Sequence, residues 1–496
     1  MSIFNKDSLS RSLEKNIEII KEIFNNDDTL VVRLLENQHD NSFKCCTIFS
    51  EGMVNNNVVN ENIILPIVKN TIPKKESNTI KDLQYKVIVS NNVERTEDID
   101  QLTQSIIGGD TILFLEGSKE ALIISSKGWE TRSISEPPSE KVIKGPREGF
   151  TESMIENLSM IRRKIKTPDL KFKFFTLGEK TNTKGCICYV DGIANEQIID
   201  ELYKRLEKFN MDGALGVNYI QEYVKDHPLS PFKTTGNTER PDVVAAKLLE
   251  GRVALILDGT PVAMTVPYVF VEYFQSNEDY YLNFYFGSIG RILRILGFLI
   301  TTSVPAIYLA LVTFHQELIP TPLILSISAA RQDVPFPTVV ELIGLLIVFE
   351  ILREAGTRMP TYIGQALSIV GALVLGQAAV QARFVSAPVV IIVALSGITG
   401  LMIPSLTGIS IISRLVLLLF SSALGLYGYT FGILALLVYL FSIKSFGVPF
   451  MANITSLDLQ ELKDTAIRVP WWYMEYRPRL IATKNPRRKS FGGRKR

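Results

Sequence analysis

Four ionisable residues lie on one apolar helical run of the chain, and their types and spacing are the strongest chemical signal in the sequence. They are Glu341, Glu350, Arg353 and Glu354. An ionisable side chain costs about 2.5–3.5 kcal/mol at the centre of a membrane helix, so such residues face protein or water and mark function. Glu350 and Arg353 are three positions apart and can pair on one helix face. The pattern indicates either a charged coupling helix or a structural ion-pair network, and the sequence alone does not choose between them.

The apolar run that follows, at 362–382, is unusually rich in small and amide-bearing side chains. Small residues allow helices to pack closely, and amides form hydrogen bonds between membrane helices. The same residues also suit a pore-lining helix, in which glutamine side chains around a symmetry axis meet water. The residues themselves favour packing over a pore. The candidates for pore or gating positions are Gln365, Ser368, Gly371, Ala372, Val374, Gly376, Gln377 and Gln381.

The rest of the chain offers little for catalysis. The only histidines are His39, His227 and His315, and neither of the two hairpins predicted in the polar half carries a nucleophile with a base, a phosphate-cradling glycine loop or a metal cluster. The cysteines, Cys45, Cys46, Cys186 and Cys188, match zinc-ligand spacing poorly and are interpreted as buried free thiols on strands. We therefore expect no enzyme activity, no cofactor and no metal, and interpret the polar half as a binding or coupling module.

The net charge of +2 averages over unlike regions. Residues 1–285 are polar, residues 290–445 contain long apolar runs, and the last fifty residues are basic. No secretory signal is evident at the start, so we expect the first region to stay in the cytoplasm. The predicted fold is a soluble α/β region of two subdomains, followed by an all-α membrane domain with several spans. The predicted divisions are 1–145, 146–285, 286–445 for the membrane domain, and 446–496 for a basic cytoplasmic tail.

Hydrophobic periodicity predicts helices over 8–26, 151–166 and 241–250, and strands over 28–35 and 170–177. Two predicted hairpins share one pattern. Gly109, Glu116, Gly117 and Ala121 align at a constant offset with Gly251, Asp258, Gly259 and Ala263. An acidic residue followed by glycine is a common tight-turn signal, so the pattern fits either chance convergence of two hairpins or two similar α/β subdomains.

Five apolar segments follow, at 289–314, 339–352, 362–382, 389–406 and 415–443. A membrane span needs about 20 apolar residues. Because the second segment is short and charged, we predict four spans plus a short charged helix. This topology keeps both termini in the cytoplasm, as the basic tail favours.

Prolines and aromatic residues indicate boundaries. Pro335 and Pro337 precede the charged run and are interpreted as helix boundaries rather than hinges. Trp471, Trp472, Tyr473 and Tyr476 lie among prolines and arginines, which is typical of an interfacial belt on anionic lipid. We favour membrane lipid over nucleic acid as the partner of this tail.

Several long motifs resemble those of the GerA-type spore germination proteins, A subunit. They are PFPTVVELIGLLIVFEILREAGTRMPTYIGQALSIVGALVLGQAAVQ at 335–381, SPF at 230–232, ERPDVVAAKLLEGRVALILDGTP at 239–261, QSNEDYY at 275–281 and KSFGVPF at 444–450. The resemblance implies a germinant receptor in the inner membrane of a bacterial endospore. It also implies a transporter-like B subunit and a lipoprotein C subunit as partners, and a homo-oligomer with channel character.

Other interpretations stay open. Within the same superfamily, the chain also resembles the stage V sporulation protein AF type. A secondary transporter and a non-conducting scaffold are alternatives of other classes. The apolar half shows no visible repeat, which argues against a transporter built from inverted repeats.

Overall fold

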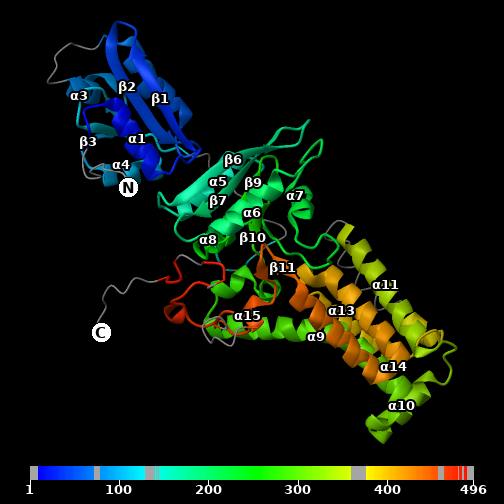
Figure 1. The fold of residues 1–496 in the computed structure, drawn as a ribbon. Helices are drawn as coiled ribbons and strands as arrows, with labels where there is room; N and C mark the ends of the chain where they lie inside the picture. The colour runs from blue at the N-terminus through cyan, green and yellow to red at the C-terminus, as the bar shows by residue number, and fades with distance from the viewer. Residues whose placement is uncertain are drawn as a thin grey trace.

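The computed structural model contains two α/β units followed by a helical part (Figure 1). Both units carry a five-stranded sheet, and the helical part carries the long apolar helices. The predicted fold class, an α/β region of two subdomains followed by an all-α part with apolar helices, is therefore confirmed. The structure describes residues 9–71, 79–128, 140, 142, 144–358, 376–455, 463–478, 480–482 and 485–488.

The first unit is an antiparallel sheet in the order β1-β2-β4-β5-β3, covered on both faces. Alternate residues of a strand point to opposite faces. Cys46 and Ile48 therefore pack with α1 and α4, whereas Cys45 packs with η1, α2 and η2. The elements are α1 (Leu13–Ile23), β1 (Leu30–Asn37), β2 (Asp40–Ser50), η1 (Val58–Ile64), α2 (Leu65–Lys69), α3 (Thr79–Asp82), η2 (Leu83–Val87), β3 (Val93–Thr96), α4 (Ile99–Ile107), β4 (Thr111–Leu115) and β5 (Ala121–Ile124).

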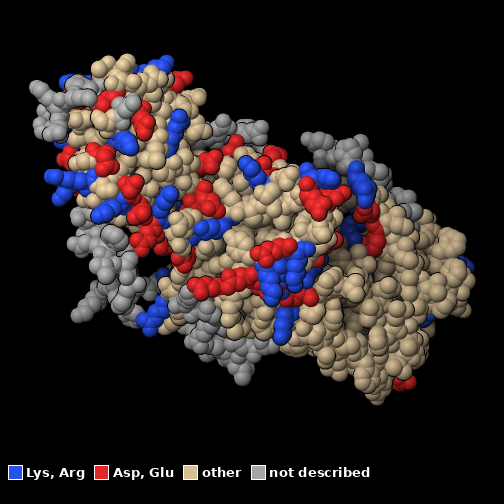
Figure 2. Space-filling view, turned by 45° about the horizontal axis from the view of Figure 1, so that its top comes forward, with Lys and Arg blue, Asp and Glu red and all other residues tan. Residues whose placement is uncertain are grey.

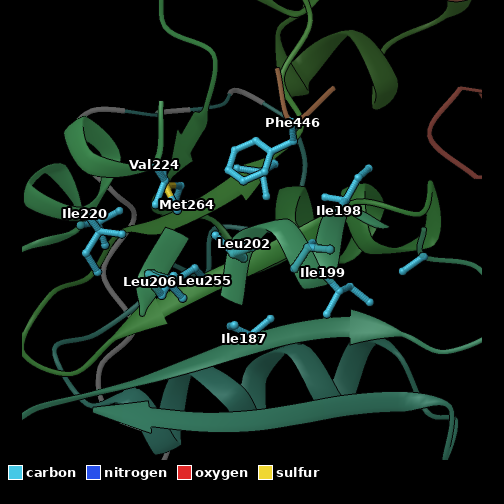
Figure 3. Packing of buried hydrophobic residues seen from close by; sticks show 14 of the residues in the cluster. Ile187, Ile198, Ile199, Leu202, Leu206, Ile220, Val224, Leu255, Met264 and Phe446 are labelled. Carbon is cyan, nitrogen blue, oxygen red and sulfur yellow. The ribbon is translucent and has the colours of Figure 1, made fainter. Parts of the chain in front are cut away.

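The second unit is an antiparallel sheet in the order β6-β7-β9-β10-β8. Leu255 and Ile187 face α6 and α7, and Figure 3 shows this core with Leu202 and Met264. Cys186 and Cys188 face α5 and α8 on the other side. The elements are α5 (Met154–Lys164), β6 (Leu170–Leu177), β7 (Thr183–Val190), α6 (Glu196–Leu206), α7 (Val217–Val224), β8 (Gly236–Thr238), α8 (Pro241–Leu249), β9 (Val253–Leu257) and β10 (Ala263–Val266). All four cysteines are buried and free, as predicted.

The repeated hairpin pattern reflects two units of one topology. In strand order and chain order, β1 to β5 of the first unit correspond to β6, β7, β8, β9 and β10 of the second. The acidic turn residue has the same task in both: Glu116 accepts from the backbone N–H of Leu13 at 2.9 Å, and Asp258 accepts from that of Met154 at 3.0 Å. Each hairpin therefore holds the start of its unit's first helix, and the structure favours two similar subdomains over chance convergence.

A buried ion pair joins the two units. Arg162 of α5 donates to Asp27, which precedes β1, at 2.6 Å, and both side chains are buried. The adjacent Asp28 accepts from the backbone N–H of Phe174 in β6 at 2.8 Å. The turn between α1 and β1 is thus fixed against the edge of the second sheet.

The helical part begins after two short 3-10 turns. Among the described residues, two stretches are long and apolar enough to cross a membrane by length and composition, Phe284–Phe314 and Pro404–Ser442, and Ala387–Gly400 is a shorter apolar helix. The elements are η3 (Phe270–Phe274), η4 (Asn277–Tyr280), α9 (Phe284–Phe314), η5 (Gln316–Leu318), α10 (Thr321–Arg331), α11 (Thr338–Arg358), α13 (Ala387–Gly400), η6 (Pro404–Leu406), α14 (Thr407–Ser442), β11 (Lys444–Ser445), β12 (Val448–Pro449), α15 (Ala452–Thr455) and η8 (Trp471–Tyr473).

Helix α14 folds back on itself. Gly425 has φ +61° and ψ −136°, which interrupts the helix, and this left-handed φ suits glycine. A Cβ on Gly432 would lie 2.9 Å from Leu417, fifteen positions away, so the two arms are antiparallel. Ile409 and Leu440, near opposite ends of α14, share one core cluster. The sequence predicted one continuous segment at 415–443 instead of this hairpin. The turn was not apparent because the glycines that permit it and the close approach of the arms lie inside an unbroken apolar run.

Helix α11 is longer than the segment predicted at 339–352. It has 21 residues and extends through all four ionisable positions. Pairs along the helix accommodate the charges near its end: Arg353 pairs with Glu350 and Arg358 with Glu354, and Glu350 also accepts from Arg414 of α14. Of the next predicted segment, residues 376–381 are helical, and 362–375 lie outside the described residues.

Candidate functional site

A cluster of charged side chains lies where α11, α13 and α14 meet. Glu350 forms the predicted ion pair with Arg353 on α11. Its other carboxylate oxygen, Oε1, accepts from Arg414 Nη2 of α14 at 2.7 Å. Arg414 is only 4% exposed, so its charge depends on this partner. Glu350 is therefore shared by two arginines, one of them 64 positions away in the chain.

A hydroxyl network extends the cluster to α9. Arg414 Nη1 donates to Ser396 Oγ of α13 at 3.0 Å, and Ser396 Oγ donates to the carbonyl oxygen of Thr301 in α9 at 2.9 Å. The Thr301 and Thr399 hydroxyl oxygens are 2.8 Å apart. Four helices thus meet through one polar network, in which the loss of one member leaves others buried without partners.

Glu354 does not join this cluster. It pairs with Arg358 at 2.6 Å, four positions along α11, and their side chains are 62% and 78% exposed. An exposed ion pair of this spacing contributes only about 0.3–0.5 kcal/mol.

Glu341 lies at the other end of α11, nine positions from Glu350, or about 14 Å along the helix. Its side chain is fully buried. Glu341 Oε2 accepts from both the backbone N–H and the hydroxyl of Ser386 at 2.8 Å. Its other oxygen, Oε1, lies 3.8 Å from Nε of Arg331. The structure therefore distributes the four predicted residues over three sites.

The two signature prolines lie just before α11. The carbonyl oxygen of Pro337 accepts from the backbone N–H groups of Val340 at 2.9 Å and Glu341 at 3.2 Å. Pro337 thus stands at the start of the helix, where a proline is tolerated, and Pro335 precedes it by two residues. This placement agrees with the interpretation of both as helix boundaries.

The pore candidates are only partly visible. Gln365, Ser368, Gly371, Ala372 and Val374 lie outside the described residues. Gln377 and Gln381 are exposed on the helical stretch 376–381, and a Cβ on Gly376 would lie 3.6 Å from Val390 of α13. A pore role for these residues stays a prediction.

A second ion network joins the α/β units to the helical part. Asp279 of η4 accepts from Arg291 Nε at 3.0 Å and from Arg294 Nη2 at 2.6 Å, both on α9. Arg291 is fully buried and also donates to Asp464 Oδ1 at 2.7 Å. Burial raises the pKa of Asp279, but the hydrogen bonds from Arg294 and from the backbone N–H of Ser276 outweigh it, so the pKa is lowered overall.

Comparison with known proteins identifies the family of this chain. The chain matches the family described as Bacillus/Clostridium GerA spore germination protein over residues 18–480. This chain belongs to the GerA family. Spore germination protein KA of Bacillus subtilis is 42% identical over 480 residues, covering 96% of this chain and 88% of the relative. Spore germination protein B1 of the same species is 34% identical, covering 95% of this chain and 97% of the relative.

Other relatives include the uncharacterized membrane protein YfkQ of Bacillus subtilis, which is 38% identical over 96% of this chain and 93% of its own length. Among solved structures, the N-terminal domain of the A subunit of the Bacillus megaterium spore germinant receptor GerK3 is 30% identical. It covers 53% of this chain and 97% of its own, with a TM-score of 0.40. The resemblance inferred from the motifs is confirmed by the family match.

In this GerA-family chain, the C-terminal aromatic residues lie at the start of α9. Trp471 packs on Tyr280 with ring centroids 5.8 Å apart, and Trp472 on Phe284 at 6.3 Å. Arg468 donates to the carbonyl oxygen of Leu282 at 2.8 Å. The described part of the tail is therefore folded onto the junction. On the face shown in Figure 2, charged side chains gather over the α/β units, whereas the helical end is mostly uncharged.

Sequence reasoning missed Arg414 and Asp279 as site residues. Arg414 had a usable signal, since it is a lone cation in an apolar run. Asp279 lies in the GerA-like motif QSNEDYY, but nothing in the motif shows that α9 supplies its partners.

Proposed function

We propose that this chain is the A subunit of a nutrient germinant receptor in the inner membrane of the endospore. It acts there with a transporter-like B subunit and a lipoprotein C subunit. In this proposal the B subunit dominates nutrient recognition, and this chain converts binding into ion release as a homo-oligomeric channel. The names of its relatives, including spore germination proteins KA and B1, support the role in germination.

The proposal divides the chain at residues 145, 285 and 445, and places the helical part in the membrane with both termini in the cytoplasm. The position of the chain beyond α14 supports this. Phe450, which follows α14, packs with Phe232 of the second α/β unit at a centroid distance of 6.1 Å. The helical hairpin thus returns the chain to the side on which the α/β units lie.

The observation that carries the proposal is the ion network at Asp279. It clamps the end of the second unit to α9 through Arg291 and Arg294. Helix α9 is in turn joined to the Glu350 cluster through Thr301 and Ser396. A displacement of the α/β units would therefore be carried along α9, from Arg291 and Arg294 to Thr301, and from there through the polar cluster to the helices next to the pore candidates.

The decisive experiment measures ion release from spores without nutrient, normalised to protein level. Gln377→Leu and Gln381→Leu are the variants, because both side chains are exposed on the described helical stretch. If these amides line an aqueous path, ion release changes while protein abundance stays constant. Tyr427→Leu, at an exposed position of α14, is the control. Loss of function that follows abundance for every variant would contradict the pore assignment.

Planar-bilayer recordings of the purified chain, alone and together with the B and C subunits, distinguish the rival classes. Gated single-channel currents support the channel. Slow substrate-coupled flux indicates a secondary transporter, and silence in the presence of the B and C subunits indicates a non-conducting scaffold or an accessory protein of the stage V sporulation AF type.

A further inference from the structure

A groove of about 640 Å³ lies between α11 and α14. This volume falls within the roughly 300–1,000 Å³ of clefts that bind small molecules, which are mostly apolar with a few polar groups. The groove fits that description, because most of its wall is aliphatic and its ionisable residues are few. It is lined by Ile343, Leu346, Ile347, Glu350, Ile351, Glu354, Ala355, Arg358, Ile411, Arg414, Leu415 and Leu418.

The groove is amphiphilic along its length. Ile343 and Arg358 are fifteen positions apart on α11, so the groove follows the helix for about 22 Å. Its ionisable residues on α11 begin at Glu350, and Arg414 is in the second turn of α14. This end faces the α/β units, since Ile409 at the start of α14 packs in the same cluster as Phe232.

The charged end carries an excess of positive charge. The lining at this end holds two arginines and two glutamates, and the excess comes from Arg353, which pairs with Glu350 but lies outside the lining. Arg414 and Glu350 are both committed to the polar network described above. Arg358 is different, because its side chain is 78% exposed and, within the described part of the chain, is paired only with the exposed Glu354. Such a pair is worth little, so Arg358 is available to a second anion at small cost.

We infer that this groove binds one anionic phospholipid, with an acyl chain along the aliphatic wall and the headgroup phosphate at Arg358. Basic pockets between membrane helices on the cytoplasmic side are recognised sites for anionic headgroups. The inference rests on the proposal that the helical part lies in a membrane. It does not depend on ion conduction.

The test uses photocrosslinking of the full-length chain in vesicles of equal parts phosphatidylglycerol and phosphatidylcholine. Benzoylphenylalanine replaces Ile351, which lines the groove, or Val438, which is exposed on the second arm of α14. One basic residue near a membrane surface favours anionic lipid by about fivefold. We therefore expect about a fivefold excess of phosphatidylglycerol adducts at position 351, and a ratio near one at position 438.

Two matched pairs of variants sharpen the result. Arg358→Gln should abolish the excess of phosphatidylglycerol adducts at position 351. Arg383→Gln should not, and it is a matched control because Arg383 is also exposed (66%) and paired with an acidic residue, Asp333. Ala355→Trp should fill the groove and remove adducts at position 351, whereas Ala435→Trp on an exposed face of α14 should leave them.

Three outcomes overturn the inference. Equal lipid ratios at positions 351 and 438 would show ordinary lipid contact. A crosslink from position 351 to a second copy, or to another segment of the same chain, would assign the groove to protein. A lack of lipid adducts at both positions would also contradict the membrane placement itself, whereas adducts at 438 alone would overturn only the groove assignment.

Discussion

The two ion networks of this GerA-family protein differ in how completely their shared carboxylate is enclosed. At the junction, Asp279 and Arg291 are both buried, and Arg291 has a second carboxylate partner in Asp464. In the helical part, Arg414 is buried but Glu350 is 20% exposed and borders the groove. An enclosed carboxylate held by two arginines keeps one geometry, whereas a carboxylate that borders a cavity has space to rearrange. The comparison suggests a fixed clamp at Asp279 and an adjustable contact at Glu350.

Removal of the shared carboxylate at the junction should have the largest effect. Asp279→Asn leaves Arg291 buried with only Asp464 and deprives Arg294 of its carboxylate, and breaking a buried pair in this way costs about 3–5 kcal/mol. We expect a sharp fall in protein abundance and in the midpoint of thermal unfolding. Asp333→Asn, which removes an exposed partner of Arg383, is the control and should change neither.

Removal of the buried arginine in the helical part should have a smaller effect. Arg414→Leu leaves Glu350 paired with Arg353 and partly exposed, so we expect a loss of about 1–3 kcal/mol. The double variant Arg414→Leu/Glu350→Gln should be less harmful than the sum of the single changes, because each residue is the other's partner. Additive losses in thermal unfolding would show that the pair is not coupled.

The pH dependence of stability should further distinguish the junction network at Asp279 from the cluster at Glu350. Because the pKa of Asp279 is lowered in the folded protein, its ionised form stabilises the fold above the unfolded pKa of about 3.9. This contribution falls as the pH drops below that value through the folded pKa. Unfolding of the wild type between about pH 5 and pH 2 should therefore depend more steeply on pH than that of Asp279→Asn. Parallel curves would contradict the assignment.

The smallest effect is expected one helical turn beyond Glu350. Glu354→Gln breaks only the exposed pair with Arg358, so stability should change by less than about 0.5 kcal/mol. A loss as large as that of Arg414→Leu would mean that Glu354 is buried by a partner in the assembled receptor.

Much of the local structure followed from the sequence. The strand predicted at 170–177 is β6, the helices predicted at 151–166 and 241–250 contain α5 and α8, and both hairpins form as expected. Periodicity and turn residues encode such elements because they depend on neighbours in the chain. The pair of Glu350 with Arg353 was also predictable, since it needs only helical spacing.

The remaining features depend on distant segments. Nothing near Glu350 in the sequence shows that Arg414 of another helix is its second partner. Similarly, α11 continues beyond the predicted 352 because its charges find partners: Arg353 pairs with Glu350 and Arg358 with Glu354 on α11 itself, and Glu350 also accepts from Arg414 of α14. The fold-back at Gly425 was hidden because the apolar run continues unchanged through the turn.

The sequence by itself determined the family, the order of polar and apolar regions, and the local elements within each. Composition and short-range spacing are sufficient for these, because burial preference and turn geometry act within a few residues. Only the tertiary structure decided that the two hairpins belong to units of one topology, that the four ionisable residues of α11 occupy three sites, and that Asp279 clamps α9. These outcomes depend on which buried charges meet across the fold, since a buried ion must find its partner wherever the packing places one.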